Sequence, residues 1–150
     1  MQAMEISRTA LDVEWRRLEI ISENLANANV ANSSKSAPYH ELQLLSGPKT
    51  DFASYLTAQK SGGDSGIDIN KLDGVAVYGL QPGNAAPRLV HEPGNPLADA
   101  NGMVSYPAID QANQMTQMLQ STRAYEADLV AMNMAREMYS KALQLGGSSQ

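Results

Sequence analysis

The chain has 150 residues, a formal net charge of −5 and no cysteine. The acidic balance argues against a nucleic-acid partner, whose phosphates are bound by basic side chains, and the lack of cysteine excludes disulfides, thiolate metal sites and cysteine nucleophiles. Aromatic residues make up 5% of the chain, too few for a thick compact core.

The N-terminal run MQAMEISRTALDVEWRRLEI holds no uninterrupted apolar stretch, because Glu5, Arg8, Asp12 and Glu14 interrupt it. It therefore predicts neither a secretory signal peptide nor a membrane-spanning helix. We expect no direct insertion into a membrane, and the net negative charge also disfavours binding to a membrane surface.

Residues 1–32 are expected to form an N-terminal assembly helix, since residues 3–30 contain no Gly or Pro. The helix carries two apolar stripes on opposite faces, and such a helix needs two neighbours. One neighbour could be the C-terminal helix of the same chain, and the other is expected from another chain, because no third long helix is predicted. The first stripe comprises Met4, Leu11, Trp15, Leu18 and Leu25, and the second comprises Ile6, Val13 and Ile20.

Residues 33–107 are predicted to be an irregular middle region with short strands. All 7 prolines and 9 of the 11 glycines lie there; the other two glycines are Gly146 and Gly147. Because Gly and Pro interrupt regular structure, this region should consist of turns and strands. The alternating residues 75–80, the run 88–92 and the run 103–106 are strand candidates, and residues 47–66 are predicted to be a flexible insertion.

Residues 108–145 are predicted to form a C-terminal coiled-coil helix of roughly 36 residues, about 54 Å long. Its seam has two sets of residues, each repeating every seven positions, so a partner helix must wind around it left-handedly. Gln114 lies outside this seam and is expected to be exposed. The first set is Met118, Tyr125, Met132 and Tyr139, and the second is Thr122, Leu129, Arg136 and Leu143. Residues 146–150 are predicted to be a disordered tail.

These patterns predict a mainly α fold in which long N- and C-terminal helices pair as a coiled coil. A small β-containing, loop-rich middle segment is displayed from an elongated body. Burial of both stripes in one ordinary compact bundle stays open as an alternative.

Both ends of the chain resemble a known family, the flagellar rod, hook and hook-associated axial proteins. The run LDVEWRRLEIISENLANANV is similar to the family's N-terminal signature, which ends in an Asn-Leu-Ala-Asn motif, here Asn24, Leu25, Ala26 and Asn27. The run MLQSTRAYEADLVAMNMAREMYSKALQLG is similar to the C-terminal signature, whose core includes Arg123 and Tyr125. The short length and the run APRLVHEPGNPLADANGMVSYP are typical of a proximal rod subunit.

The resemblance implies a structural protein and not an enzyme. Members of the family are made in the cytoplasm and exported by the flagellar type III apparatus without a cleaved signal peptide. They then assemble with copies of themselves and with other rod proteins into a hollow, torque-transmitting rod across the periplasm. No cofactor, metal or small-molecule substrate is implied. We expect the assembly contacts from Leu11, Trp15, Leu18, Leu25, Met118, Tyr125, Leu129, Met132, Tyr139 and Leu143.

The asparagine-rich run ISENLANANV, residues 21–30, has two interpretations. Its amides could satisfy backbone groups and fix register where the helix packs against other subunits, as a buried Asn does in coiled coils. It could equally be a helix C-cap and nothing more.

Two rival functions remain open. A soluble adaptor or secretion chaperone could present a coiled coil to one partner. An enzyme could be built around His91 and Asp99, although the chain contains no nucleophile elbow, P-loop or dinucleotide fingerprint. The run DSGIDINKLDG does not match a calcium-binding loop.

Overall fold

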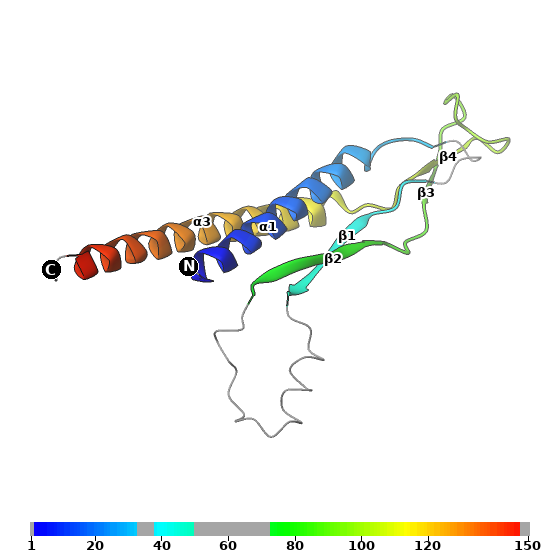
Figure 1. Ribbon diagram of the computed structural model, residues 1–150. Helices are drawn as coiled ribbons and strands as arrows, with labels where there is room; N and C mark the ends of the chain where they lie inside the picture. The colour runs from blue at the N-terminus through cyan, green and yellow to red at the C-terminus, as the bar shows by residue number, and fades with distance from the viewer. Residues whose placement is uncertain (1, 33–37, 50–72, 148–150) are drawn as a thin grey trace, which may run out of the picture. The chain divides into compact units, whose positions relative to one another are not determined.

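The structure is a computed structural model that describes residues 2–32, 38–49 and 73–147 (Figure 1). Long helices occupy both ends of the chain, and the middle contains two small two-stranded sheets. The predicted mainly α architecture with a small β-containing middle is therefore confirmed. The elements in order are α1 (Gln2–Asn27), β1 (Leu42–Pro48), β2 (Val75–Pro82), β3 (Arg88–His91), β4 (Met103–Tyr106) and α3 (Gln111–Gly147).

Three of the four strands lie where the sequence predicts them. Strands β3 and β4 pair antiparallel, with Arg88 opposite Tyr106 and His91 opposite Met103. Strands β1 and β2 form a second ribbon, flanked by a bond from Gly83 N to Glu41 O (2.7 Å) and another from Lys49 N to Gly74 O (2.9 Å). Both ribbons are therefore antiparallel.

Strand β1 was not predicted, because LQLLSGP lacks a simple alternation of apolar and polar residues. Its last two residues, Gly47 and Pro48, fall in the segment 47–66 that the sequence assigns to a flexible insertion. They are strand instead, and Pro48 stands at the strand's end, where a missing N–H is tolerated. Residues 50–66 of that prediction lie outside the described part of the chain.

The helix ends follow recognisable local signals. The carboxylate of Asp110 accepts hydrogen bonds from Ala112 N (3.0 Å) and Asn113 N (3.2 Å), which makes Asp110 the N-cap of α3. At the end of α1, Val30 N donates to Asn27 O. Helix α3 includes Gly146 and Gly147, two residues more than predicted. No helix among the described residues is both long and apolar enough to span a membrane.

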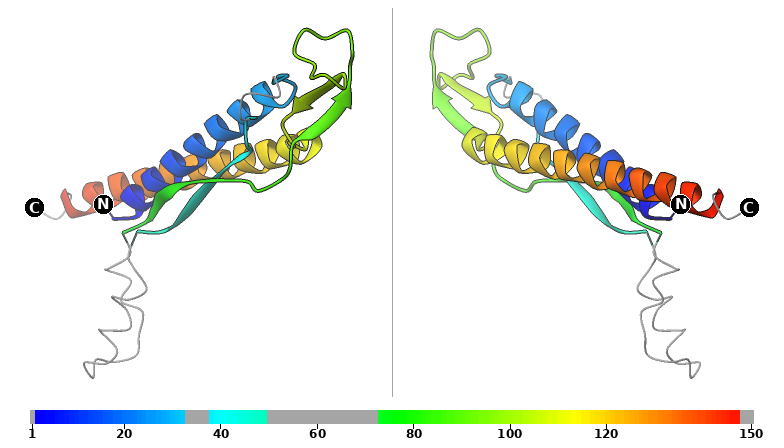
Figure 2. Two further views of the ribbon diagram at one scale, coloured as in Figure 1. Left: turned by 90° about the vertical axis from the view of Figure 1, so that its right-hand side faces the viewer. Right: turned by 90° about the vertical axis from the view of Figure 1, so that its left-hand side faces the viewer.

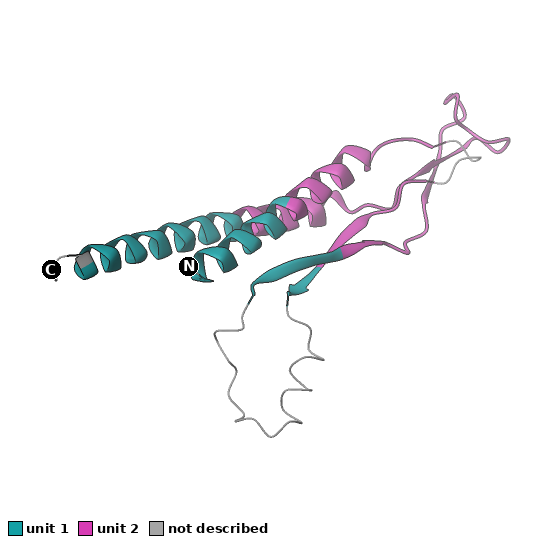
Figure 3. Ribbon diagram, viewed as in Figure 1, with its two compact units in different colours: residues 1–15, 46–78, 123–150 teal, residues 16–45, 79–122 magenta. Residues whose placement is uncertain are grey.

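The chain divides into two compact units, and each long helix contributes to both (Figure 3). Unit 1 comprises residues 1–15, 46–78 and 123–150, and unit 2 comprises residues 16–45 and 79–122.

Within unit 1, α1 lies between α3 and the β1–β2 ribbon (Figures 1 and 2). On one face, the ring of Trp15 lies 6.5 Å from the ring of Tyr125 on α3. On the other, Val75 N of β2 donates to the hydroxyl of Thr9 (3.1 Å), and Gly74 lies directly against Ile6 and Thr9. The ribbon thus covers the face that carries the second stripe, and Val13 of that stripe is buried.

The prediction that the second stripe needs another chain is therefore wrong for this face. A two-stranded ribbon supplies the missing neighbour, so a third long helix is not required. The error arose because β1 was not recognised.

The buried face of α3 also differs from the predicted seam. The residues that are buried or half-buried include a set spaced by seven: Gln114, Ser121, Asp128 and Ala135, with Tyr125 and Met132 between them. Gln114 is 1% exposed, so its predicted exposure is wrong. In the predicted second set, Thr122 and Leu129 are half-buried, whereas Arg136 and Leu143 are exposed.

Candidate assembly surfaces

Asn24, the first residue of the Asn-Leu-Ala-Asn motif, is the centre of a buried polar cluster in unit 2. Its amide oxygen accepts hydrogen bonds from Leu42 N (2.9 Å) and from the Tyr39 hydroxyl (2.9 Å). Its amide nitrogen donates to Leu42 O (2.9 Å) and to the Gln114 side-chain oxygen (3.1 Å). With 1% of its surface exposed, Asn24 holds the start of β1 and the first turn of α3 against α1.

Gln114 extends the cluster from α3 to the segment before β1. Its amide nitrogen donates to the Glu41 carboxylate (2.8 Å), and the backbone oxygen of Glu41 accepts from Gly83 N. A buried amide is tolerated only when its donors and acceptors are satisfied. Asn24 and Gln114 satisfy this condition through each other, through the backbone of Leu42 and through the side chains of Tyr39 and Glu41.

Tyr39 adds a phenol to the cluster from the segment before β1. Partial burial, and then the negative charge of Glu23, raises the pKa of the Tyr39 phenol above its ordinary value. The phenol therefore stays protonated and can donate to Asn24 over a wider pH range than a free tyrosine.

The asparagines of the run ISENLANANV thus have different roles. Asn24 makes its hydrogen bonds within the chain, to backbone and side-chain groups of three residues. Asn27 donates from its side chain to Glu23 O (2.8 Å) and is the last residue of α1, but no described residue other than glycine has a positive φ, so it is not a left-handed C-cap. Tyr39, Glu41 and Gln114 were not predicted as partners of Asn24.

The predicted assembly residues are distributed between helix faces that are covered and faces that remain open. On α1, Leu11, Leu18 and Leu25 are half-buried, and Trp15 is 64% exposed despite its contact with Tyr125. On α3, Tyr125, Leu129 and Met132 are half-buried, whereas Met118, Tyr139 and Leu143 are exposed. Of the other motif residues, Ala26 and Arg123 are exposed.

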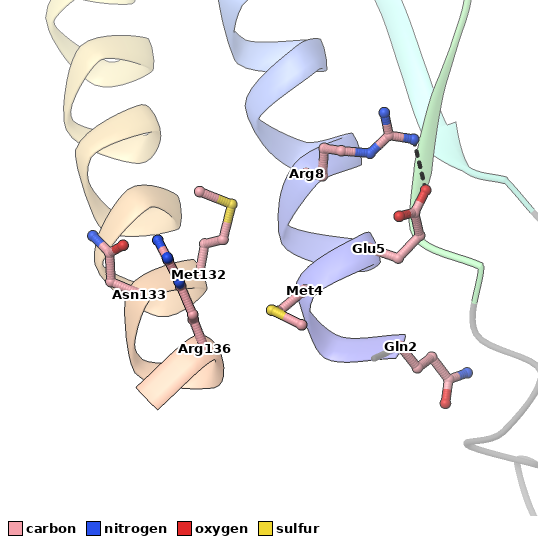
Figure 4. A pocket seen from close by; sticks show the side chains of 7 residues that line it. All are labelled: Gln2, Met4, Glu5, Arg8, Met132, Asn133 and Arg136. Carbon is pink, nitrogen blue, oxygen red and sulfur yellow. Dashed lines mark hydrogen bonds and ion pairs between the residues drawn. The ribbon is translucent and has the colours of Figure 1, made fainter. Parts of the chain in front are cut away.

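An open groove of about 480 Å³ lies between the first turns of α1 and the second half of α3, within unit 1 (Figure 4). Met4 points from α1 toward α3, and Arg8 is turned onto Glu5, with which it forms an ion pair at 2.6 Å. This bond, followed by the charge of Arg8, lowers the pKa of Glu5. The lining residues are Gln2, Met4, Glu5, Arg8, Met132, Asn133 and Arg136.

The loop that joins β3 to β4 in unit 2 is held by hydrogen bonds between its own residues. The Asp99 carboxylate accepts from Asn101 N (2.8 Å) and Met103 N (2.9 Å), and Gly102 takes a positive φ of 73°. Asp99, considered above as a catalytic candidate, has its carboxylate engaged in shaping this turn. Among the described residues, no three His, Asp or Glu side chains gather into a group that could hold a metal ion.

Comparison with known proteins assigns the two ends of the chain to flagellar families. Residues 4–32 match the family described as "Flagella basal body rod protein". Residues 100–145 match the family described as "Flagellar basal body rod FlgEFG protein C-terminal". The matched segments contain nearly all of α1 and α3.

Similarity also extends over almost the whole chain. The flagellar basal-body rod protein FlgC of Salmonella typhimurium is 32% identical over 146 residues, covering 97% of each chain. FlgC of Bacillus subtilis is 33% identical over 149 residues, with 96% of each chain covered. FlgC of Agrobacterium fabrum is 32% identical over 151 residues, which are 99% of this chain and 96% of the relative. The chain therefore belongs to the FlgC family of flagellar basal-body rod proteins.

Proposed function

We propose that this chain is a structural subunit of the proximal rod of the bacterial flagellar basal body. It is exported from the cytoplasm by the flagellar type III apparatus without a cleaved signal peptide. Its terminal helices then pack as coiled coils with copies of itself and with other rod proteins. The resulting rod crosses the periplasm and transmits the motor torque needed for motility.

The observation that carries this proposal is the agreement between family and architecture. Both family matches fall on the segments that form the long terminal helices. These helices retain large apolar side chains at the surface, including Trp15 and Leu143. Exposed apolar groups of this kind mark interaction surfaces.

The proposal assigns separate work to each segment. The assembly segments are residues 1–32, which contain α1, and residues 108–145, which contain most of α3; residues 33–107 form the displayed middle region, and residues 146–150, of which the first two belong to α3, follow. Subunit contacts come from Leu11, Trp15, Leu18, Leu25, Met118, Tyr125, Leu129, Met132, Tyr139 and Leu143. The subunit works by packing alone, with no catalytic residue and no cofactor.

The direct test is a strain that lacks this chain, examined for swimming and by electron microscopy of its isolated basal bodies. The proposal predicts non-motile cells whose membrane-embedded base remains while rod, hook and filament are missing. Complete, motile flagella in that strain would contradict the proposal and would favour a coiled-coil adaptor or secretion chaperone.

A further inference from the structure

The side of α3 that faces away from α1 carries an apolar ridge in unit 1. Val130, Met134 and Met138 recur every four residues and are 54%, 60% and 66% exposed. Residues four apart stack along one face of a helix and form the ridges with which helices interlock. Glu137 lies beside Met134 and Met138 on the same surface.

The groove between α1 and α3 is concave and could receive a ridge of this kind. Met4 and Met132 supply its apolar part, and methionine adapts readily to the partner that fills a gap. Trp15 extends the apolar surface along the same side of α1, because residues 4, 8, 11 and 15 follow helical spacing. Among the described residues, Arg136 of the groove forms no ion pair, whereas Arg8 is paired with Glu5.

We propose that the Val130–Met134–Met138 ridge of one copy of this chain docks in the Met4–Met132 groove of a second copy. The inference rests on the proposed function, since it names the surfaces through which the subunit assembles. The groove continues the α1–α3 packing already present within the chain, so a third helix placed there extends an existing interface. Glu137 on the incoming ridge brings a carboxylate to Arg136, which makes the two surfaces complementary in charge.

The two surfaces lie on different sides of the same helix, which determines the kind of assembly. A contact between unlike surfaces leaves a free groove on one copy and a free ridge on the other. Such head-to-tail contacts generate a ring when the rotation closes and an open helical array when it does not. The ridge-in-groove contact is therefore suited to a tube wall and unsuited to a closed two-fold dimer.

Disulfide trapping tests the contact, because the chain has no cysteine of its own. Purified full-length Met4→Cys chains are mixed with full-length Met138→Cys chains and oxidised, and mixed dimers are quantified on non-reducing gels. A disulfide forms only when the two Cα atoms approach to about 4.4–6.8 Å. The matched control replaces Met138→Cys by Ser140→Cys, an exposed residue of the same helix that points about 200° around the helix from residue 138.

The inference predicts mixed dimers from Met4→Cys with Met138→Cys, and few from Met4→Cys with Ser140→Cys. Equal yields from both pairs would overturn it, since they would report only random collision. A chain that still sediments as oligomers without forming the first disulfide would place the contact elsewhere and leave the proposed function standing. A chain that neither oligomerises nor cross-links would exclude contacts between its own copies, whereas the basal-body phenotype tests the function independently.

A charged ridge provides a second measurement with a different readout. Met134→Asp places an unpaired charge in the contact and should weaken the association constant between copies by more than about tenfold. Sedimentation velocity measures this association. Gln144→Asp adds the same charge elsewhere on α3 and should leave association unchanged. An equal loss in both variants would mean that net charge, and not the ridge, governs association.

Discussion

Asn24 connects the N-terminal motif to the rest of the fold through four hydrogen bonds to three residues. Each partner comes from a segment distant in sequence, so the sequence around residues 21–30 could not identify them. The sequence did indicate that amides gather at the end of α1, and it left open whether they fix register or cap the helix. Asn24 fixes register within the chain, and Asn27 marks the helix end.

Replacing Asn24 by Ala should destabilise the fold strongly. The change leaves the N–H and C=O of Leu42, the Tyr39 hydroxyl and the Gln114 side-chain oxygen without their partner in a buried site. Stranded polar groups of this kind should lower the free energy of unfolding by about 2–4 kcal/mol. Urea denaturation measures the loss, and Asn27→Ala is the control, with an expected change of about 0.5 kcal/mol or less. Similar losses in both variants would show that the cluster has no special importance.

The Tyr39–Asn24 bond should make stability depend on alkaline pH. Since the folded pKa of Tyr39 is raised above its ordinary value of 10.0, folding favours the protonated phenol. Its contribution is therefore complete below the unfolded pKa and is lost as the pH rises through the higher folded pKa. The stability gap between the unmodified chain and Tyr39→Phe, measured from about pH 8 to about pH 11, should narrow at the alkaline end. Because the raised pKa of Tyr106 is common to both chains, a constant gap would contradict the role assigned to Tyr39.

At the scale of elements, the long helices and three strands were predictable from local patterns. Gly and Pro are confined to the middle of the chain, and hydrophobic spacing identifies both helices. The sequence could not predict which face of α3 is buried. The row formed by Met118, Tyr125 and Met132 can be completed by the residues on either side of it around the helix. Apolar Leu129 and Leu143 favoured one side, whereas the structure buries Gln114 and Ser121 on the other. Gln114 can be buried because its amide is hydrogen-bonded, and Ser121 can be buried because its side chain is small.

The register of α3 can be tested by enlarging one residue on its buried face. Ser121 is 3% exposed, so Ser121→Leu forces a larger side chain into a packed site and should cost about 1–3 kcal/mol of stability. Gln120→Leu introduces the same side chain at an exposed neighbour and should have little effect. Thermal unfolding of both variants makes the comparison, and the reverse ranking would mean that α3 is rotated.

The contact between α1 and the β1–β2 ribbon can be tested at Gly74. This residue has φ of 88°, and an added Cβ would collide with the Thr9 hydroxyl. Gly74→Ala should therefore destabilise the chain by roughly 1–3 kcal/mol. Gly94→Ala is the matched control, because no heavy atom lies within 4 Å of its added Cβ. Equal unfolding midpoints for the two variants would argue that the ribbon does not pack on α1 at this point.

For the whole molecule, sequence and structure agree on the two terminal helices and the β-containing middle. They differ on which segments cover the apolar faces of the helices. The resemblance carried by both terminal helices predicted the family, which the full-length relatives confirm. The sequence also assigned α1 two neighbours, but one of them is a ribbon of the same chain. The surfaces left open for assembly are consequently the outer side of α3 and the groove beside α1, and not the second stripe of α1.

Incorporation of this chain into the rod can be observed by antibody-gold labelling of isolated basal bodies, viewed by electron microscopy. We expect label along the proximal rod in basal bodies whose rod is exposed, and none in preparations from the strain lacking the chain. Recovery of the chain only in the soluble fraction, with no label on the axial structure, would show that it is not a rod subunit.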